Sequence, residues 1–391
     1  MNKIAIIEPI GAHGGNDIYD CNLVRSLDIQ KDFSGILFTC GVVNSNVNIK
    51  LTYKNIFGNG NKFLRFLHYL KGTISSLWLA RKEGSDIVHL HFFGFNALEY
   101  LNLFLAKRFF SFNVIGTIHD VESFEKYAKN DGSKQDYKKF IRLMSGVVVH
   151  TEYARQELLK NIGSKMFDAS KIKTIYACDL EYSTLGSNQI DVSVARKRLN
   201  LPLDKKIILF FGQIKTVKGL DVLLNALAIA CKKNNNLLLV VAGKVWKDDF
   251  SVYEKIITKH KLHDNVNLRI GFVDNKDVPL YFNADDVIVL PYRKIYNSGV
   301  LIRAMSYATP IIASDFGPFK EFIRHNKNGL LFRAGDSEDL ARKILNAFTN
   351  VENLTNMGVE AKRMIVDQFS LDSIGKQYVN IYSRVLKEGV Q

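Results

Sequence analysis

The sequence lacks the patterns that would indicate a disulfide-rich, zinc-binding or membrane-spanning protein. Its 4 cysteines are scattered, with no CxxC pair and no clustered histidines, which argues against a disulfide framework and against a zinc site. No segment approaches the roughly 18 uninterrupted apolar residues that cross a bilayer. The amino terminus has a short apolar run but no cleavage-site pattern. We therefore expect a protein of a reducing cytoplasm.

Acidic residues are absent from residues 33–82, although the whole chain carries a formal charge of +14. Within this stretch, residues 62–71 interleave basic side chains with large apolar ones, as an amphipathic helix on an anionic membrane does. The alternative is a solvated basic helix whose apolar side faces the core. No recognisable nucleic-acid-binding module is present, so we expect an anionic membrane surface, and no nucleic acid, as the acidic partner.

Length and hydrophobic content indicate two or three domains, because 391 residues with 47 % apolar content can bury more than one core. Short apolar runs alternate with helical patterns, which predicts an α/β protein with parallel sheets. In the first half the predicted strands are 3–7, 35–39, 87–91, 114–119, 147–150 and 172–175. In the second half they are 206–212, 237–243, 266–270, 287–290, 310–313 and 329–332.

These patterns predict two doubly wound, Rossmann-like domains. The expected boundaries are an N-terminal domain at 1–182, a linker at 183–200, a C-terminal domain at 201–368 and a terminal amphipathic helix at 369–391.

Polar residues at the ends of predicted strands are the first candidates for a site, because ligands bind at the carboxyl edge of open parallel sheets. In the first domain these are His89, His91, His119, Asp120 and His150. The pair His119 and Asp120 is our first choice, since a histidine at a strand end can donate a hydrogen bond to a sugar or a phosphate. A structural role for each histidine is the alternative.

The segment 291–321 contains a helix start that could bind an anion. It leads from the strand 287–290 into a helical pattern through Asn297, Ser298 and Gly299, and Asn297 or Ser298 can cap that helix. Free backbone N–H groups at a helix start bind phosphate without any basic side chain. An ordinary capped helix is the alternative.

Two other loops carry phosphate-binding potential. Lys215 and Lys218 follow the strand 206–212 and can act as point charges for phosphate oxygens, or be solvated surface lysines. The glycine-rich turn 11–15 follows the first strand, but its spacing is not GxGxxG, and such a turn is more often a tight connection than a ligand cradle.

Ordered segments of the chain resemble the glycosyltransferases of family 4. The likeness covers nearly the whole chain and is strongest between residues 206 and 345. The segments that carry it are FFGQIKTVKGLDVLLNAL, LVVAGK, RIGFV, YFNADDVIVLPYR, SGVLIRAMSYATPIIASDFGPFKEFI and NGLLFRAGDSEDLA. The resemblance implies the GT-B fold, in which two Rossmann-like domains face each other and a C-terminal helix crosses back to the first. It also implies a retaining transfer of a sugar from a nucleotide-sugar donor, with no metal and no other cofactor.

The resemblance also assigns roles to individual residues. It implies that His119 contacts the donor sugar or its phosphates and that Lys218 binds the diphosphate. The other residues that it places around the donor are Gly14 and Gly15 near the diphosphate, the amides of Ser298, Gly299 and Val300 at the phosphate and ribose, and Gly271, Phe272 and Val273 beside the base.

Three positions depart from the family pattern. Gln213 stands where the family usually has a phosphate-binding arginine, and it brings hydrogen bonds but no charge. Ile295 and Arg303 stand in place of a pair of glutamates, of which the second ordinarily accepts ribose hydroxyls. Arg303 can only donate, so ribose recognition must differ or be absent.

The function expected from these residues is transfer of a hexose from a nucleotide sugar to a polysaccharide or lipid-linked glycan acceptor in bacterial cell-surface polysaccharide synthesis. The enzyme would be cytoplasmic, peripheral on the inner face of the membrane, with the first domain on the acceptor side. One alternative is a nucleotide-sugar 2-epimerase, which needs paired carboxylates. The other is an inactive glycosyltransferase-like binding or scaffold protein, which the substitutions at Gln213, Ile295 and Arg303 would favour.

Overall fold

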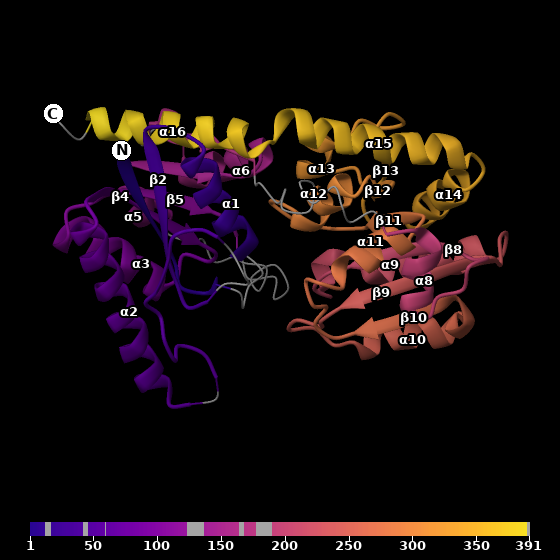
Figure 1. Cartoon of the computed structure of the whole chain (residues 1–391). Coiled ribbons are helices and arrows are strands. Elements are labelled where there is room, and N and C mark those ends of the chain that lie inside the picture. The colour runs from indigo at the N-terminus through magenta and orange to yellow at the C-terminus, as the bar shows by residue number, and fades with distance from the viewer. Residues whose placement is uncertain are drawn as a thin grey trace. The chain divides into compact units, whose positions relative to one another are not determined.

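The computed structural model of the chain (Figure 1) describes residues 1–11, 17–41, 46–58, 60–122, 137–163, 168–176 and 190–388. It divides into two compact units. The first combines Met1–Glu181 with Phe369–Gln391, and the second spans Tyr182–Gln368. Each unit is built around one parallel sheet with helices packed against it, which is the predicted arrangement of two Rossmann-like domains.

The first unit contains a seven-stranded sheet in the order β3-β2-β1-β4-β5-β6-β7. Its strands are β1 (Asn2–Glu8), β2 (Phe33–Thr39), β3 (Ile49–Leu51), β4 (Ser85–Phe92), β5 (Asn113–Ile118), β6 (Gly146–Val149) and β7 (Ile172–Thr174). The chain order reverses between β1 and β4, which is therefore the topological switch point of this sheet.

The helices of the first unit lie between consecutive strands, except for the last helix of the chain, which returns to this unit. They are α1 (Asp17–Asp28), α2 (Lys62–Lys82), α3 (Ala97–Phe104) with a π-helical turn (Leu105–Phe109), α5 (Tyr137–Ile141), α6 (Glu152–Ile162) and α16 (Leu371–Glu388), besides the 3-10 turn Ala169–Lys171. Because helices cover the sheet, strand side chains on both faces are apolar and buried, as in the run Ile4 to Ile7 of β1.

The terminal helix α16 belongs to the first unit, although it follows the second in sequence. It packs on α1 so closely that a Cβ atom at Gly375 would lie 2.1 Å from the carbonyl oxygen of Ser26. Its predicted apolar face is buried and reaches the sheet, because the hydroxyl of Tyr382 lies 2.6 Å from Nδ1 of His89 on β4. The expected return of the last helix to the first domain is thus present.

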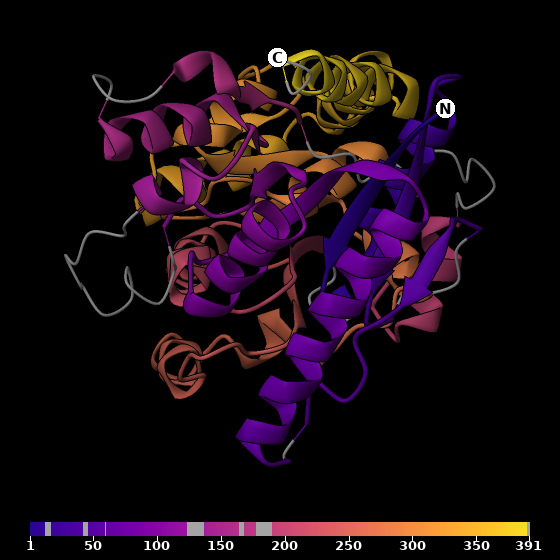
Figure 2. The same ribbon diagram turned by 90° about the vertical axis from the view of Figure 1, so that its left-hand side faces the viewer.

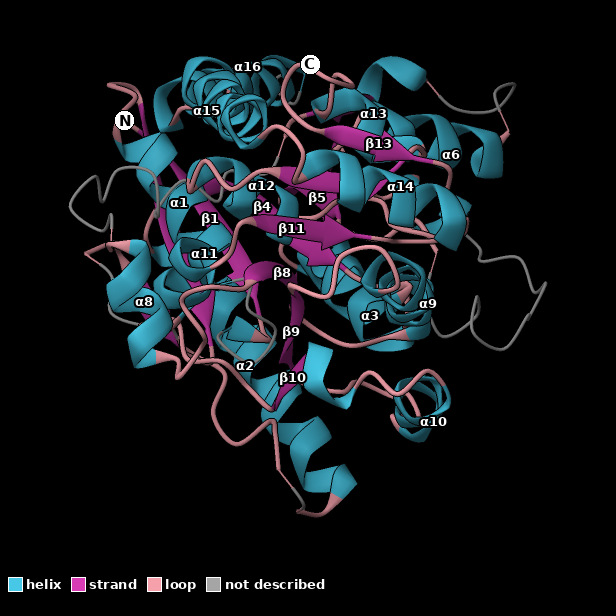
Figure 3. Cartoon of the chain, turned by 90° about the vertical axis from the view of Figure 1, so that its right-hand side faces the viewer, coloured by secondary structure: helices cyan, strands magenta, loops and turns pink. Residues whose placement is uncertain are grey.

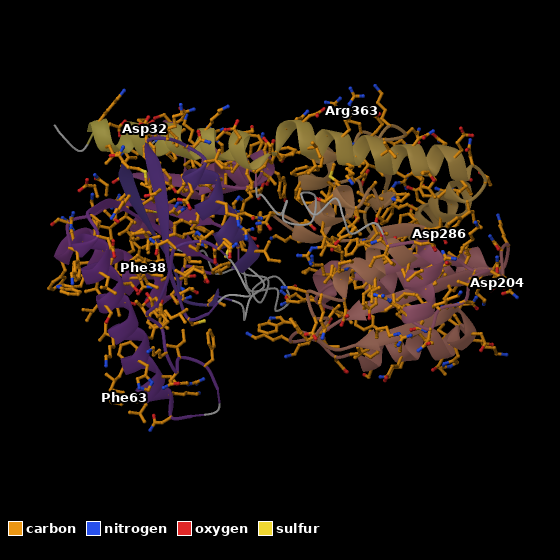
Figure 4. The ribbon with its side chains drawn as sticks, in the orientation of Figure 1. Asp32, Phe38, Phe63, Asp204, Asp286 and Arg363 are labelled. Atoms are coloured by element: carbon orange, nitrogen blue, oxygen red, sulfur yellow. The ribbon has the colours of Figure 1, made fainter. Side chains whose placement is uncertain are left out.

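Helix α2 is longer than the predicted segment 62–71 and is exposed at its beginning. Figures 1 and 2 show its first turns extending away from the sheet, and Figure 4 labels Phe63 at that end. Phe63, Leu64, Phe66 and Leu67 are all exposed to solvent. The alternative in which these apolar side chains face the core is therefore wrong.

The second unit contains a six-stranded sheet in the order β10-β9-β8-β11-β12-β13, part of which Figure 3 shows with β8 and β11 as neighbours. Its strands are β8 (Lys206–Phe211), β9 (Leu237–Gly243), β10 (Val266–Ile270), β11 (Val287–Leu290), β12 (Ile311–Ser314) and β13 (Leu330–Phe332). Its helices are α8 (Val192–Arg198), α9 (Leu220–Cys231), α10 (Ser251–Lys259), α11 (Val278–Ala284), α12 (Gly299–Ser306), α13 (Gly317–Phe322), α14 (Ser337–Ala347) and α15 (Val351–Gln368), with 3-10 turns at Thr216–Lys218 and His263–Asn265.

Helix α8 is bound tightly to the second unit. The buried guanidinium of Arg196 donates from Nε to the carbonyl oxygen of Ala284 at 2.9 Å and from NH2 to Oδ2 of Asp286 at 2.8 Å. The same carboxylate oxygen accepts the backbone N–H of Ile207 at 2.6 Å. Within the segment 183–200, residues 190–200 therefore pack as part of this unit, and 183–189 lie outside the described residues.

Two elements go beyond the predicted series, and both depend on tertiary pairing. The three residues of β3 become a strand only by pairing with β2, with Leu37 opposite Ile49. Helix α15 packs on α12, and a Cβ atom at Gly358 would lie 2.0 Å from the carbonyl oxygen of Ala308. Short edge strands and close helix contacts of this kind leave weak local signals in the sequence.

Candidate functional site

The candidate site of the second unit lies at the topological switch point of its sheet. The chain order reverses between β8 and β11, and the two loops predicted to bind phosphate follow these two strands. Ligands of open parallel sheets bind at the carboxyl ends of the strands on either side of such a point.

The loops after β8 and β11 are held together by direct contacts. Gly219 adopts a left-handed conformation (φ +68°), and a Cβ atom there would lie 2.0 Å from the carbonyl oxygen of Pro291. The backbone N–H of Arg293 donates to the carbonyl oxygen of Val217 at 2.8 Å, and its guanidinium forms two hydrogen bonds with the carboxylate of Asp221. A bidentate pair of this kind fixes both loops relative to each other.

Lys218 lies at this junction. Its ammonium group lies 3.7 Å from the ring centroid of Tyr292, which is a cation–π contact within the usual range. Tyr292 is fully buried, and burial raises the pKa of its hydroxyl, so the ring is neutral. A positive charge held on a rigid ring at the switch point is well suited to an anionic ligand.

The start of α12 is the second part of this site. Ser298 caps the helix, since its Oγ accepts the backbone N–H of Leu301 at 3.2 Å. The first intrahelical bond runs from the N–H of Ile302 to the carbonyl oxygen of Ser298, so the amides of Gly299 and Val300 precede the hydrogen-bonded turns. Of the two residues predicted as caps, Ser298 takes the role.

Three glycines line the carboxyl edge of the sheet beside α12. Gly212 follows β8, and a Cβ atom there would lie 3.3 Å from a side-chain methyl of Val300. Gly243 ends β9 with φ +152°, where a Cβ atom would lie 1.8 Å from the carbonyl oxygen of Gly212. Gly271 follows β10 with φ +154° and donates its N–H to the carbonyl oxygen of Gly243 at 3.0 Å. Glycine is required at the second of these positions, because a side chain would collide with backbone.

The remaining predicted donor-binding residues of this unit surround the same edge. Phe272 and Val273 follow β10, and the Phe272 side chain is 75 % exposed. Gln213 is exposed in the loop after β8, and Arg303 is half-buried one turn into α12. The structure thus brings the predicted residues of the second unit to one edge of one sheet. Their roles in binding remain predictions.

In the first unit, His119 belongs to a buried cluster of aromatic and titratable side chains. Its ring stacks on Phe93 with centroids 4.5 Å apart, and it lies 5.1 Å from the ring of His91 and 5.0 Å from that of His150. Tyr19 contacts all three histidines edge-on or tilted.

The histidines of this cluster are neutral at physiological pH. Burial lowers the pKa of His91 and of His150 to about 4, and burial together with the neighbouring histidines lowers those of His89 and His119 well below the usual value. His119 can therefore act as a hydrogen-bonding group but not as a cation. His89 has a structural role, since its two nitrogens lie within hydrogen-bonding distance of the hydroxyls of Tyr382 and Thr117.

Sequence reasoning missed the acidic members of this cluster. Oδ1 of Asp20 on α1 lies 3.1 Å from Nδ1 of His91, and Glu8 at the end of β1 is fully buried. The Glu8 carboxyl accepts the N–H groups of Ile10 and Gly11, and burial and the Asp20 carboxylate raise its pKa to about 8. The only sign of this acidic group in the sequence is that Glu8 directly follows the predicted apolar strand 3–7.

Gly14 and Gly15 lie outside the described residues. Among the described helices none is long and apolar enough to cross a membrane. Within the same part of the chain, no three or more His, Cys, Asp or Glu side chains are grouped so that they could hold a metal ion.

Two family models match the chain. The model for glycosyl transferases group 1 matches residues 191–364, and the model for glycosyltransferase family 4 matches residues 50–178. The two matches therefore fall on the two structural units separately and together cover most of the chain.

Individual relatives agree with these matches. An uncharacterized glycosyltransferase of Methanocaldococcus jannaschii is 27 % identical over 194 residues, which are 48 % of this chain and 47 % of that protein, so the chain spans about half the length of this relative. N-acetyl-alpha-D-glucosaminyl L-malate synthase of Bacillus anthracis is 25 % identical over 314 residues, covering 79 % of this chain and 77 % of that protein.

Among solved structures, the Anabaena protein HepE in complex with UDP-glucose superposes with a TM-score of 0.74 at 17 % identity. The superposition covers 98 % of this chain and 100 % of that one. At this identity the likeness is one of fold.

Proposed function

Because this chain belongs to the glycosyltransferases of family 4 and has their GT-B fold, we propose that it moves a sugar, with retention of configuration, from a nucleotide-sugar donor to a polysaccharide or lipid-linked glycan acceptor. The donor would bind at the switch point of the second unit. One observation carries the proposal: two anion-binding features occur at this switch point. They are the Lys218 ammonium on the Tyr292 ring and the capped start of α12.

The chemistry of the transfer favours such an arrangement. Negative charge develops on the leaving nucleoside diphosphate as the bond to the sugar breaks, and positioned donors that match this charge lower the barrier. The Lys218 ammonium supplies a full charge, and the amides of Gly299 and Val300 supply oriented dipoles, so the reaction would need no metal ion. Neutral His119 would donate or accept a hydrogen bond at the sugar.

Arg303 would take a different role from the acidic residue that the family usually has at this position. A guanidinium cannot accept ribose hydroxyls, but it can donate to phosphate oxygens. We therefore expect Arg303 to contact the diphosphate and not the ribose hydroxyls.

The proposal is tested by incubating the purified protein with a panel of nucleotide sugars that includes UDP-glucose and UDP-N-acetylglucosamine, with and without a chelator, and measuring sugar release or transfer. Lys218→Ala should lower the rate roughly 10²- to 10³-fold, as loss of one transition-state donor does. Lys233→Ala, which removes an exposed lysine of the same unit, is the matched control. Tight donor binding without turnover in the wild type would instead support a scaffold protein.

We also propose that the enzyme works on the inner face of an anionic membrane and that α2 docks there. Phe63, Leu67, Ile74 and Trp78 recur at helical spacing and are exposed, forming what we call the α2 stripe. Basic side chains flank it in a segment without acidic residues. Exposed apolar side chains with lysines and arginines beside them are typical of helices that lie in a membrane interface.

Trp78 makes this docking directly measurable. The chain has 2 tryptophans, so Trp246→Phe leaves Trp78 as the single reporter. We expect its emission to shift to the blue with vesicles containing phosphatidylglycerol and to stay unchanged with purely zwitterionic vesicles. Replacing Lys62, Arg65 and Lys71 with Glu should abolish sedimentation with the anionic vesicles.

The control for the charge change replaces the three exposed lysines Lys232, Lys233 and Lys261 of the second unit with Glu. It alters the net charge equally and should leave sedimentation intact. Equal loss in both triple variants would mean that overall charge, and not α2, determines membrane binding.

A further inference from the structure

A cavity of about 390 Å³ lies at the edge of the first unit's sheet, between β7 and the terminal helix α16. This volume falls in the range of small-molecule sites, which is about 300–1,000 Å³. Among the described residues, two cationic side chains, two amides and no carboxylate line it. They are Lys173 after the first residue of β7, and Gln377, Asn380 and Arg384 on α16, above the apolar Ile175 and Ile381.

Lys173 faces α16 because of the register of the sheet. Its neighbour on β6 is Val148, which lies on the same face as Gly146. A Cβ atom at Gly146 would lie 3.2 Å from Cδ1 of Ile381, so this is the face that α16 covers. The next residue of β7, Thr174, points to the other face, where its hydroxyl donates to Oε2 of Glu152 on α6 at 3.0 Å. Lys173 therefore extends toward the helix that forms the second wall.

The polar side chains of α16 that line the cavity share one face of the helix. Gln377, Asn380 and Arg384 are spaced by three and four residues, which places them one above the other. NH1 of Arg384 donates to the carbonyl oxygen of Ser170 at 2.8 Å, and it carries a second N–H. This hydrogen bond fixes the guanidinium and leaves that second N–H for a ligand.

The positive charge of the lining is little compensated. Within the described part of the chain, Lys173 has no ion pair. Two carboxylates interact with Arg384, but neither lines the cavity: Oε1 of Glu388 lies 3.8 Å from its Nε, and Asp168 caps the 3-10 turn Ala169–Lys171. Exposed pairs of this kind contribute little energy. The lining is thus suited to an anion.

Both walls are held in place by contacts within the protein. The hydroxyls of Tyr378 on α16 and Tyr19 on α1 lie 2.7 Å apart, and the backbone N–H of Ile175 donates to the carbonyl oxygen of Val149 at 2.9 Å. A ligand would therefore bind to side chains whose backbone is already ordered, which lowers the entropic cost of binding.

A lysine on an edge strand does not by itself indicate a ligand, since such lysines discourage pairing with other chains. The observation that does is a cavity with a cation on each of two facing elements and two amides beside them. Ammonium and guanidinium groups together match the oxygens of a phosphate. Side-chain amides both donate and accept, which matches hydroxyl groups.

We propose that this cavity binds a sugar phosphate, with the phosphate between Lys173 and Arg384 and the sugar hydroxyls at the amides of Gln377 and Asn380. The site goes beyond the proposed glycosyl transfer, because it lies in the first unit and the proposed donor site lies in the second. A ligand that bridges β7 and α16 would also stabilise the packing of the last helix on the first unit.

The test is calorimetric titration of the full chain with glucose 1-phosphate, glucose 6-phosphate, mannose 6-phosphate, inorganic phosphate and glucose. Lys218→Ala is titrated beside the wild type, because the proposed donor site also attracts phosphate. In this variant at least one hexose phosphate should bind at one site per chain, about fivefold or more tighter than inorganic phosphate, which is the usual worth of one added hydrogen bond. Glucose should not bind. Failure of all three hexose phosphates, or equal affinity for inorganic phosphate, would overturn the proposal.

The charge of Lys173 has its own test. Lys173→Met keeps the apolar stem and should weaken hexose phosphate binding about tenfold or more, as loss of one charged hydrogen bond does. Lys171→Met removes the same charge two residues earlier, outside the lining, and is the matched control. Equal losses in the two variants would refute a specific contact of Lys173 with the ligand.

Filling the cavity locates the binding site. Asn380→Trp, at an exposed position of α16, should abolish hexose phosphate binding, whereas Lys387→Trp, exposed on the same helix but outside the lining, should not. Gln377→Trp serves if Asn380→Trp does not fold. Undiminished binding by a folded cavity-filling variant would refute the site.

Thermal unfolding gives a second readout. A hexose phosphate that binds should raise the melting temperature of the wild type and of Lys218→Ala, but not that of Lys173→Met. Turnover of nucleotide sugars plays no part in these measurements, so failure of the proposed function and failure of this site are scored separately.

Discussion

Replacing Gly219 with alanine should damage both the stability of the second unit and its candidate donor site. Gly219 has φ +68°, a left-handed conformation that costs an L-residue about 1–2 kcal/mol. In addition, the new Cβ atom would lie 2.0 Å from the carbonyl oxygen of Pro291, and this oxygen cannot move without displacing the loop after β11. Overpacking of this kind costs about 1–3 kcal/mol, so the total loss should be about 2–5 kcal/mol.

A substitution at Gly335 serves as the control that separates the cost of the left-handed backbone from the cost of overpacking. Gly335 has φ +80° and lies in the same unit, but a Cβ atom there would meet nothing within 4 Å. Gly335→Ala should therefore show only the cost of the left-handed backbone. For a unit of this size 1 kcal/mol lowers the melting temperature by about 2–4 °C, so the control should lose a few degrees and Gly219→Ala two to three times as much.

The assay is thermal unfolding of the full chain followed by circular dichroism, together with calorimetric titration of a nucleotide sugar. Gly219→Ala should also weaken donor binding, because the displaced loops carry Lys218 and lead to α12. Gly335→Ala should leave the affinity unchanged. If both variants lose the same stability, the close approach of Gly219 to Pro291 does not constrain these loops and the reasoning fails.

Two further predictions concern a helix cap and a buried acid. Ser298→Ala and Asp336→Ala each remove a helix cap and should each cost about 1 kcal/mol in thermal unfolding. Only Ser298→Ala should weaken nucleotide-sugar binding, and equal affinities would argue against an anion site at α12. Burial raises the pKa of Glu8 from 4.5 to about 8, so folding favours the protonated carboxyl. The stability that this carboxyl contributes is therefore complete below pH 4.5 and is lost as the pH rises through 8. The buried histidines, whose pKa is lowered from 6.5, contribute the same pH dependence to the wild type and to Glu8→Gln. As the pH rises from 6.5 to 8, the melting temperature of the wild type should therefore fall relative to that of Glu8→Gln; parallel curves would contradict this.

The two-domain architecture and most strands could be predicted from the chain, because buried parallel strands are short apolar runs whose signal is local. The strand β9 was expected at 237–243, and the structure has it at Leu237–Gly243. The start of α12 was also predictable, since a capping serine followed by glycine after such a strand is a local pattern as well. The segments that resemble family 4 are also contiguous in sequence, so the fold of the second unit could be predicted from them for the same reason.

What only the tertiary structure decided is which of these segments become neighbours. His91, His119 and Tyr19 come from two strand ends and a helix, and they meet because β4 lies between β1 and β5 in the sheet. The cavity between β7 and α16 has walls from two elements that are far apart in the sequence. Strand order depends on the packing of the whole unit and not on any local pattern. The sequence alone therefore determined the elements, the fold family and the helix start at Ser298, while the buried histidine cluster and the cavity followed from how those elements pack.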